Sequence, residues 1–153
     1  EKQTSKKVDF SMSNYGGIRA AITKGNVTVS NAFELMPFDN TLVVVELNYE
    51  KIQELFAYFI SKNIAHPLSS QIELRIKNKS YDILINGKPI EKNKTYYVAT
   101  SNYLQKGGDD MNFFKNPLSM YESNFLIRDA IVEYFKSRDT LVSNLDNRII
   151  ISN

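Results

Sequence analysis

The residues best suited to bind an anion form a short segment, Asn-Tyr-Gly-Gly-Ile-Arg, at positions 14–19. This segment follows residues 8–13, whose alternation of apolar and polar side chains predicts a short strand. Adjacent glycines permit positive φ and let another group approach the main chain closely. Arg19 supplies a permanent cation with a planar fork of donors that suits phosphate or carboxylate. On these residues alone, an ordinary turn with a surface arginine is the simpler interpretation.

Two aromatic residues and an aspartate extend this candidate site. Phe38 lies in a turn after Pro37, and Tyr103 follows directly after a predicted strand. Two aromatic faces can enclose a planar base, and stacking contributes roughly 1–3 kcal/mol per base. Asp109 could accept hydrogen bonds from a sugar diol, as acidic residues do for ribose elsewhere. The alternative, in which both aromatics are ordinary core or rim residues, fits the sequence equally well.

Other catalytic patterns are missing from the sequence. It contains no Gly-x-Ser-x-Gly elbow, no phosphate-binding loop and no cysteine, and its only histidine is His66. A self-contained zinc site is therefore not expected, and His66, next to Pro67, is expected in a loop or structural role. Asp109 and Asp110 leave one alternative open, an enzyme that acts alone through a carboxylate pair. No third ligand for a metal can be identified beside them.

The composition is that of an ordinary globular protein. The 153 residues are 42% hydrophobic and 24% charged, with a net charge of +2, and predict a single domain over residues 1–153. So small a charge does not favour nucleic acid or an anionic membrane as a partner. No apolar stretch approaches the length of about 18 residues that spans a bilayer. The chain begins at Glu1 without an apolar leader, so we expect a processed protein or a part of a longer one.

The secondary-structure pattern predicts strands and helices that hold these residues. Residues 41–47 form a nearly continuous β-branched run, which predicts a strand buried on both faces. A helix is predicted from Tyr49 to about Asn63, with Asn48 as its cap and an apolar stripe along one side. We also predict a shorter helix over residues 31–36, capped by Ser30 after an extended piece at residues 27–29.

The second half of the chain predicts further strands and one more helix. The remaining strands are predicted at residues 72–76, 81–85, 96–100 and 148–151, with turns at 78–80 and 86–87. Residues 101–120 are predicted to be a long irregular loop, which is usually functional in a small domain. The last helix is predicted from Ser123 or Asn124 to about Arg138. Together these elements predict an α+β fold with a mixed β-sheet and flanking helices.

Three segments resemble the signature stretches of the C-terminal domain of 5′-nucleotidases. They are residues 14–19, residues 36–40 (Met-Pro-Phe-Asp-Asn) and residues 102–109 (Asn-Tyr-Leu-Gln-Lys-Gly-Gly-Asp). The family forms are Asn-x-Gly-x-Ile-Arg, Pro-Phe-Gly-Asn and Asn-Phe-x-x-x-Gly-Gly-Asp-Gly. Order and approximate spacing agree, and the resemblance covers essentially the whole chain. The family includes periplasmic UDP-sugar hydrolases and 2′,3′-cyclic-nucleotide phosphodiesterases.

The resemblance implies a nucleotide-binding domain. Arg19 would bind the phosphate, Phe38 and Tyr103 would stack on the base, and Asp109 would hold the ribose hydroxyls. Asn14 would lie beside the nucleoside, and Asn40 would touch the base. The residues implied for substrate binding are Asn14, Gly16, Gly17, Arg19, Phe38, Asn40, Tyr103, Gly108 and Asp109.

The resemblance places catalysis outside this chain. In the family, hydrolysis belongs to a metallophosphoesterase domain with two divalent metal ions, which would lie in the same or a separate chain. A periplasmic or extracellular location follows, with or without a surface anchor. A non-catalytic binding or interaction module that kept the fold remains the alternative.

Three departures from the family pattern concern the site. Tyr103 stands where the family usually has Phe, which keeps the stacking face and adds a hydroxyl. Asp110 stands where the family usually has Gly, so a strained or reshaped loop is expected there. The family also uses arginines on a helix before the first strand, and residues 1–7 contain none. The anion site is therefore expected to be incomplete in this chain.

Overall fold

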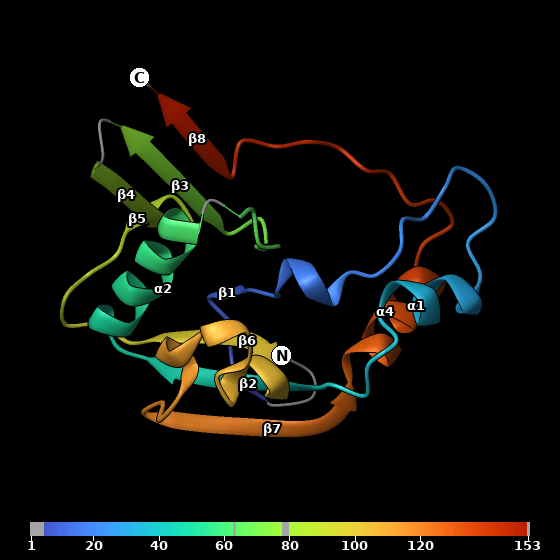
Figure 1. The fold of residues 1–153 in the computed structure, drawn as a ribbon, viewed down its shortest axis with the longest axis horizontal. Helices are drawn as coiled ribbons and strands as arrows, with labels where there is room; N and C mark the ends of the chain where they lie inside the picture. Colours follow the sequence, from blue (N-terminus) through green and yellow to red (C-terminus); the bar gives the residue numbers. More distant parts are fainter. Residues whose placement is uncertain (1–4, 63, 78–79, 153) are drawn as a thin grey trace.

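The strands that the structure describes form two four-stranded sheets (Figure 1). The computed structural model describes residues 5–62, 64–77 and 80–152. The first sheet has the order β1-β6-β2-β7 and the second the order β5-β4-β3-β8, and both mix parallel and antiparallel pairs. The predicted α+β class with a mixed sheet and flanking helices is confirmed, with the strands in two sheets rather than one.

The bounds of the elements are as follows. The first sheet contains β1 (Phe10–Ser11), β2 (Thr41–Leu47), β6 (Tyr96–Ser101) and β7 (Ser119–Leu126). The second contains β3 (Ile72–Lys77), β4 (Ser80–Ile85), β5 (Lys88–Pro89) and β8 (Ile149–Ser152). The α-helices are α1 (Val29–Leu35), α2 (Tyr49–Lys62), α3 (Asn102–Gln105) and α4 (Ile127–Lys136). In Figure 1, α2 lies between the two sheets, and α1 and α4 pack together at one end.

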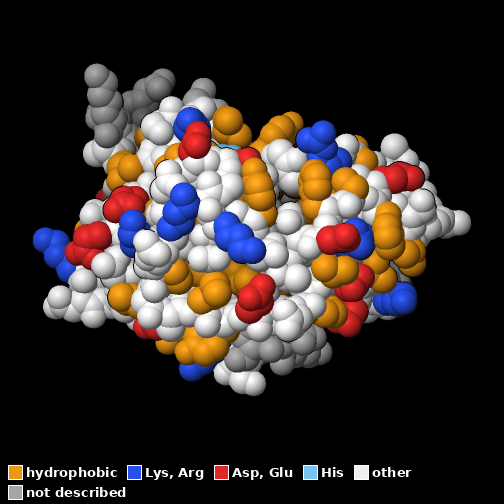
Figure 2. Space-filling view, turned by 60° about the horizontal axis from the view of Figure 1, so that its bottom comes forward, with side chains coloured by type: hydrophobic (Ala, Val, Ile, Leu, Met, Phe, Trp, Pro, Cys, Tyr) orange, Lys and Arg blue, Asp and Glu red, His pale blue; other side chains and the backbone are white. Residues whose placement is uncertain are grey.

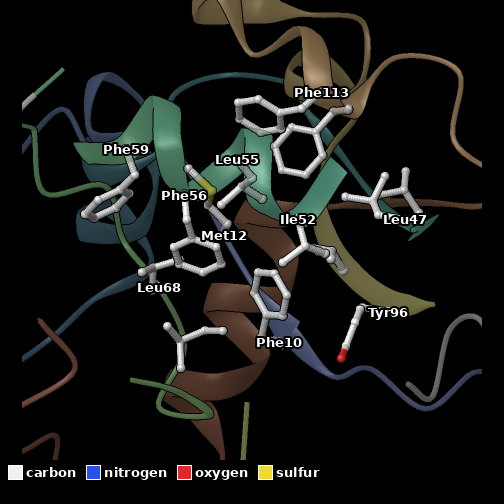
Figure 3. Close-up of a cluster of buried hydrophobic side chains, with 14 of the residues drawn as sticks. Phe10, Met12, Leu47, Ile52, Leu55, Phe56, Phe59, Leu68, Tyr96 and Phe113 are labelled. Atoms are coloured by element: carbon white, nitrogen blue, oxygen red, sulfur yellow. The ribbon is translucent and has the colours of Figure 1, made fainter. Parts of the chain in front are cut away.

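The two elements with the clearest sequence patterns, β2 and α2, form the centre of the core. The middle of β2, residues 43–45, is almost completely buried, as its β-branched run predicts. The predicted cap of α2 is confirmed, because Asn48 Oδ1 accepts the N–H of Lys51 at 3.0 Å. Complete burial of one large apolar side chain contributes roughly 1.5–3 kcal/mol. Figure 3 shows the α2 side chains converging with those of other elements, among them Phe10, Met12, Leu47, Leu68, Tyr96 and Phe113.

The register of the first sheet brings the three motif segments to one edge. β2 and β6 are antiparallel with Leu42 opposite Ser101, so the start of β2 lies beside the end of β6. β1 is parallel to β6 with Ser11 opposite Ala99, so the end of β1 lies at that same edge. The segments that follow β1, precede β2 and follow β6 therefore meet, although they are far apart in the sequence.

The start of the first helix differs from its prediction. α1 begins at Val29 rather than after Ser30, so residues 27–29 are not all extended. Asn31 Oδ1 accepts the N–H of Thr28 at 2.9 Å, which makes Thr28 the cap. Both Thr28 and Ser30 are suitable cap residues, and the asparagine three positions after Thr28 decides between them.

The start of the last helix was also predicted wrongly, because a strand takes its place. β7 pairs antiparallel with β2 over Ser119–Leu126, and α4 starts only at Ile127. The side chains of β7 alternate between partly buried and exposed positions, as expected for an edge strand with one covered face. Half of the residues of β7 are polar, and Asn124 has a positive φ, so its strand pattern is weak. Pairing with β2 overrides this weak local preference.

Residues 101–120 are less irregular than predicted. They contain α3, two short 3₁₀ turns and the first residues of β7. The predicted turn at Asn78 and Lys79 and the predicted helix end at Asn63 lie outside the described residues. Among the described helices, none is long and apolar enough to cross a membrane.

Candidate functional site

The segment after β1 forms a tight turn, which we call the glycine turn (residues 14–19). Its centre is a 3₁₀ turn at Tyr15–Gly17, closed by hydrogen bonds from the N–H of Gly17 to Asn14 O and of Ile18 to Tyr15 O, both 3.1 Å. A Cβ atom on Gly17 would lie only 2.7 Å from Asn14 Oδ1. Gly17 is therefore needed for the close approach of the Asn14 side chain, and not for a positive φ.

Arg19 ends the glycine turn with an exposed guanidinium. Its backbone N–H donates to Leu35 O at 2.9 Å, which ties the turn to the end of α1. Its Nη1 donates to Gly16 O at 3.3 Å, which keeps the cation close to the turn. Within the residues that the structure describes, no carboxylate forms an ion pair with Arg19. Its remaining donors are therefore available to an anion.

A second turn carries Asp109 in a left-handed backbone conformation. Gly107, Asp109 and Asp110 have φ angles of 88°, 53° and 61°, and only the first of them is a glycine. The strain expected at Asp110 is thus present, and Asp109 shares it. We call residues 102–110 the Asp109 loop. Backbone strain of this kind persists only where surrounding contacts hold the loop in place.

Three hydrogen bonds hold Asp109. Asn14 Nδ2 donates to Asp109 Oδ2 at 2.7 Å, and the Tyr103 hydroxyl donates to Asp109 Oδ1 at 2.8 Å. The hydroxyl of Tyr58 on α2 donates to the backbone oxygen of Asp109 at 2.6 Å. The hydrogen bond to Asp109 raises the pKa of Tyr103, because ionisation would remove the donated proton. The carboxylate is consequently fixed in one orientation by partners from the two site segments.

The ring of Tyr103 lies against Gly108. A Cβ atom on Gly108 would lie 2.4 Å from two ring carbons, so any larger residue would displace the tyrosine. The ring nevertheless remains 44% exposed. Gly108 thus allows the Tyr103 ring to pack closely against the loop while part of the side chain stays accessible.

Phe38 lies in the turn of residues 37–40, which we call the Phe38 turn, and is 41% exposed. Arg128 of α4 holds this turn, since its Nη2 donates to Asp39 Oδ1 at 2.9 Å and its Nη1 to Phe38 O at 3.4 Å. The backbone oxygen of Asn40 accepts the N–H of Ile127 at 2.9 Å, also from α4. The Phe38 turn is therefore positioned by the helix that follows β7.

One further hydrogen bond joins the Phe38 turn to the Asp109 loop. Asn102 Oδ1 accepts the backbone N–H of Thr41 at 3.1 Å, directly after the Phe38 turn. The structure therefore brings Asn14, Gly16, Gly17, Tyr103, Gly108 and Asp109 into one cluster, with Arg19 beside it. Phe38 and Asn40 lie on the adjoining turn, connected through Thr41 and Asn102.

Three residues support this arrangement; sequence reasoning missed two of them and gave the third, His66, only a general loop or structural role. They are Tyr58, which binds the Asp109 backbone, His66, which accepts from Tyr15, and Arg128, which holds the Phe38 turn. Tyr58 borders the apolar stripe of α2, which was the only sequence signal for it. No pattern links Arg128 to Asp39 across 89 positions.

The structure does not supply a metal site at this edge. Among the described residues, no three of His, Cys, Asp and Glu are grouped so that they could hold a metal ion. Two hollows of about 630 and 410 Å³ lie over the second sheet and share no residue with the cluster. Neither hollow contains a residue of the three motif segments, so we place the candidate site at the edge of the first sheet. On the face shown in Figure 2, acidic and basic side chains are interspersed rather than gathered into one patch.

Comparison with known proteins matches this chain to one family. The model of the family described as 5′-nucleotidase, C-terminal domain, matches residues 2–116. Protein UshA of Yersinia enterocolitica is 27% identical over 137 residues, which cover 87% of this chain and 25% of that protein. The trifunctional nucleotide phosphoesterase protein YfkN of Bacillus subtilis is 29% identical over 157 residues, 88% of this chain and 10% of that protein.

Solved structures agree with this result. The crystal structure of the 5′-nucleotidase precursor from Thermus thermophilus superposes with a TM-score of 0.82 at 25% identity, over 95% of this chain and 32% of that one. The NAD nucleotidase of Haemophilus influenzae shares the fold, with a TM-score of 0.75 and 21% identity over 95% of this chain and 30% of that one. This chain thus spans a third or less of each of these proteins. The chain belongs to the family of 5′-nucleotidase C-terminal domains.

Proposed function

We propose that this chain is the nucleotide-binding half of a 5′-nucleotidase-type phosphohydrolase. Phe38 and Tyr103 stack on the base, Asp109 accepts the ribose hydroxyls, and Arg19 binds the phosphate. The observation that carries the proposal is the fixed carboxylate of Asp109, held by Asn14 and Tyr103 beside exposed aromatic rings. This combination of a planar stacking surface, a diol acceptor and a cation matches the three parts of a nucleotide.

The hydrogen-bond capacity of Asp109 supports its assignment to ribose. An ionised carboxylate offers about four acceptor positions on its two oxygens. Asn14 uses one position on Oδ2 and Tyr103 uses one on Oδ1. One position on each oxygen remains, so neighbouring ribose hydroxyls can both donate to a carboxylate that is already oriented. Orientation before binding reduces the entropy lost when the ligand is bound.

Hydrolysis in this proposal belongs to a metallophosphoesterase domain, on the same or a separate polypeptide. Enzymes of this family depend on metal ions, and two divalent ions in that domain would activate water and stabilise the charge on phosphorus. The present chain binds and orients the leaving nucleoside. It would act in the periplasm or outside the cell, with or without a surface anchor. A non-catalytic module with the same site remains distinguishable by experiment.

Calorimetric titration of the chain with AMP, UMP and UDP-glucose tests the binding site. We expect millimolar or tighter binding, and a roughly tenfold weaker affinity after Phe38→Ala or Tyr103→Ala, because each removes one stacking surface. Tyr134→Ala is the control, since this tyrosine is exposed on α4 outside the cluster. No binding, or unchanged affinity in both site variants, would contradict the proposed site.

Phosphate release from AMP tests the division of labour. The chain alone should release none at an enzymic rate, and addition of a metallophosphoesterase domain should restore hydrolysis if the chain serves an enzyme. Rapid hydrolysis by the chain alone that a chelator does not affect would contradict the proposal. Nucleotide binding without hydrolysis in the presence of any such domain would favour the non-catalytic module.

A further inference from the structure

His66, the only histidine of the chain, lies beneath two segments of the site. It is 6% exposed and belongs to the connection between α2 and β3. Its Nδ1 accepts a hydrogen bond from the backbone N–H of Tyr15 at 3.1 Å. Tyr15 is the first residue of the 3₁₀ turn at the centre of the glycine turn. The hydrogen bonds within the turn are donated by the N–H groups of Gly17 and Ile18, so the N–H of Tyr15 has no acceptor in the turn itself. His66 supplies that acceptor.

The same imidazole is connected to the Asp109 loop. The ring of Tyr58 stacks on it at a centroid distance of 6.0 Å, and the ring of Phe59 packs edge-on at 5.8 Å. The hydroxyl of Tyr58 donates to the backbone oxygen of Asp109. His66 therefore contacts the glycine turn directly and the Asp109 loop through one intervening ring.

These contacts require the neutral imidazole. Since Nδ1 is an acceptor, the neutral ring carries its proton on Nε2, which is buried and has no hydrogen-bond partner among the described residues. A second proton on Nδ1 would face the N–H of Tyr15, and two donors cannot form that hydrogen bond. Protonation would also place a charge in a buried position next to two aromatic rings.

The surrounding charges act in opposite directions. Burial lowers the pKa of His66 below its usual value of 6.5, and the carboxylate of Asp109 opposes this by raising it. On α2, Tyr58 faces the imidazole and Lys62 lies over the Tyr58 ring, 5.6 Å from its centroid. Burial raises the pKa of Tyr58, and the charges of Asp109 and Asp110 raise it further. Burial is the largest of these effects on His66, so the neutral form is favoured near neutral pH.

We propose that His66 is a positioning residue of the nucleotide site, which holds the glycine turn against the Asp109 loop only while its imidazole is neutral. Protonation releases the N–H of Tyr15, disturbs the neighbouring Asn14 and thereby loosens the carboxylate of Asp109. Ligand affinity then falls on acidification. Protonation also destabilises the folded state, because the pKa of His66 is lower in the folded than in the unfolded chain. The contribution of His66 to stability is therefore fully present above about pH 6.5 and is lost progressively below it. This inference rests on the proposed nucleotide site.

Adenosine is the appropriate probe, because it has no phosphate that titrates in the range where histidine does. Its affinity is measured from pH 8 downward for the wild type and for His66→Asn, whose Oδ1 lies in the position of Nδ1 and can accept the Tyr15 N–H but does not titrate. We expect the wild-type affinity to fall about fivefold to tenfold as the imidazole titrates, in line with the loss of one buried hydrogen bond. The variant should bind within a few-fold of the wild type at pH 8 and should show no such decrease.

An NMR titration of the free wild-type chain provides a second readout that needs no variant. The Tyr15 amide signal should shift with the same midpoint as the single imidazole, and the adenosine affinity should follow that midpoint. A Tyr15 amide signal that does not change as the imidazole titrates would overturn the inference, even if His66→Asn does not fold. So would parallel pH profiles of the wild type and the variant. Absence of adenosine binding at pH 8 would overturn the proposed function and this inference together, whereas binding without the pH dependence would overturn the inference alone.

Discussion

The two sides of the candidate site are built differently. On the Asp109 side, Asn14 and Tyr103 bind the carboxylate through short hydrogen bonds, on a loop with a strained backbone. On the Phe38 side, one buried arginine, Arg128, holds an exposed aromatic turn from a neighbouring helix. The first side fixes the direction of polar groups, which suits recognition of a sugar. The second offers a flat surface, which tolerates different bases.

This comparison predicts the largest loss on the Asp109 side. Asp109→Ala should weaken AMP binding on the order of 10- to 100-fold, because hydrogen bonds to a charged group contribute about 1.5–3 kcal/mol. It should also lower the free energy of unfolding by about 1–3 kcal/mol, since the buried amide of Asn14 loses its partner. Calorimetry and chemical denaturation measure the two effects.

Asp110→Ala is the matched control for this variant. Asp110 has a similar left-handed backbone, so the conformational effect of alanine is the same in both. The difference between the two variants reports the carboxylate contacts of Asp109. Equal effects of both substitutions would mean that the loop matters only through its backbone.

A smaller effect is expected on the Phe38 side. Arg128→Met should weaken AMP binding about fivefold to tenfold and leave the affinity for ribose 5-phosphate nearly unchanged, because only the stacking contact of roughly 1–3 kcal/mol is disturbed. Arg138→Met removes an exposed arginine just beyond α4 and serves as the control. If ribose 5-phosphate binding fell as much as AMP binding, Arg128 would act through the whole fold instead of the Phe38 turn.

The smallest effect concerns the hydroxyl that distinguishes Tyr103 from phenylalanine. Tyr103→Phe keeps the stacking face and removes the hydrogen bond to Asp109. We expect about threefold weaker binding of adenosine and little change for dideoxyadenosine, because this hydrogen bond orients the carboxylate and is not itself made to the ligand. Competitive titration of both nucleosides measures the ratio. A stronger preference for the ribose form in the variant would show that the hydroxyl competes with the ligand.

The sequence predicted the parts of the molecule whose signals are local. The β-branched run of β2 and the apolar stripe and asparagine cap of α2 each lie within one element, and the structure agrees with both. The three motif segments were also found, because their residue types and order stand out without a fold. That they meet at one sheet edge follows from the register of β1, β2 and β6.

The parts that sequence reasoning missed depend on contacts between distant residues. β7 is an edge strand with a weak pattern of its own and is stabilised by pairing with β2, so its sequence alone favoured a loop and an earlier helix. Tyr58 and Asp109 are 51 positions apart, as are Tyr15 and His66. No local pattern predicts such pairs, which is why the supporting residues of the site were found only in the structure.

The most direct test of the account is NMR chemical-shift mapping of the chain with AMP. If both sides of the site bind one ligand, backbone amides of the glycine turn, the Phe38 turn and the Asp109 loop will shift together and give a single dissociation constant. Shifts confined to one side, or to the hollow of the second sheet around Arg148, would contradict a nucleotide site at this edge.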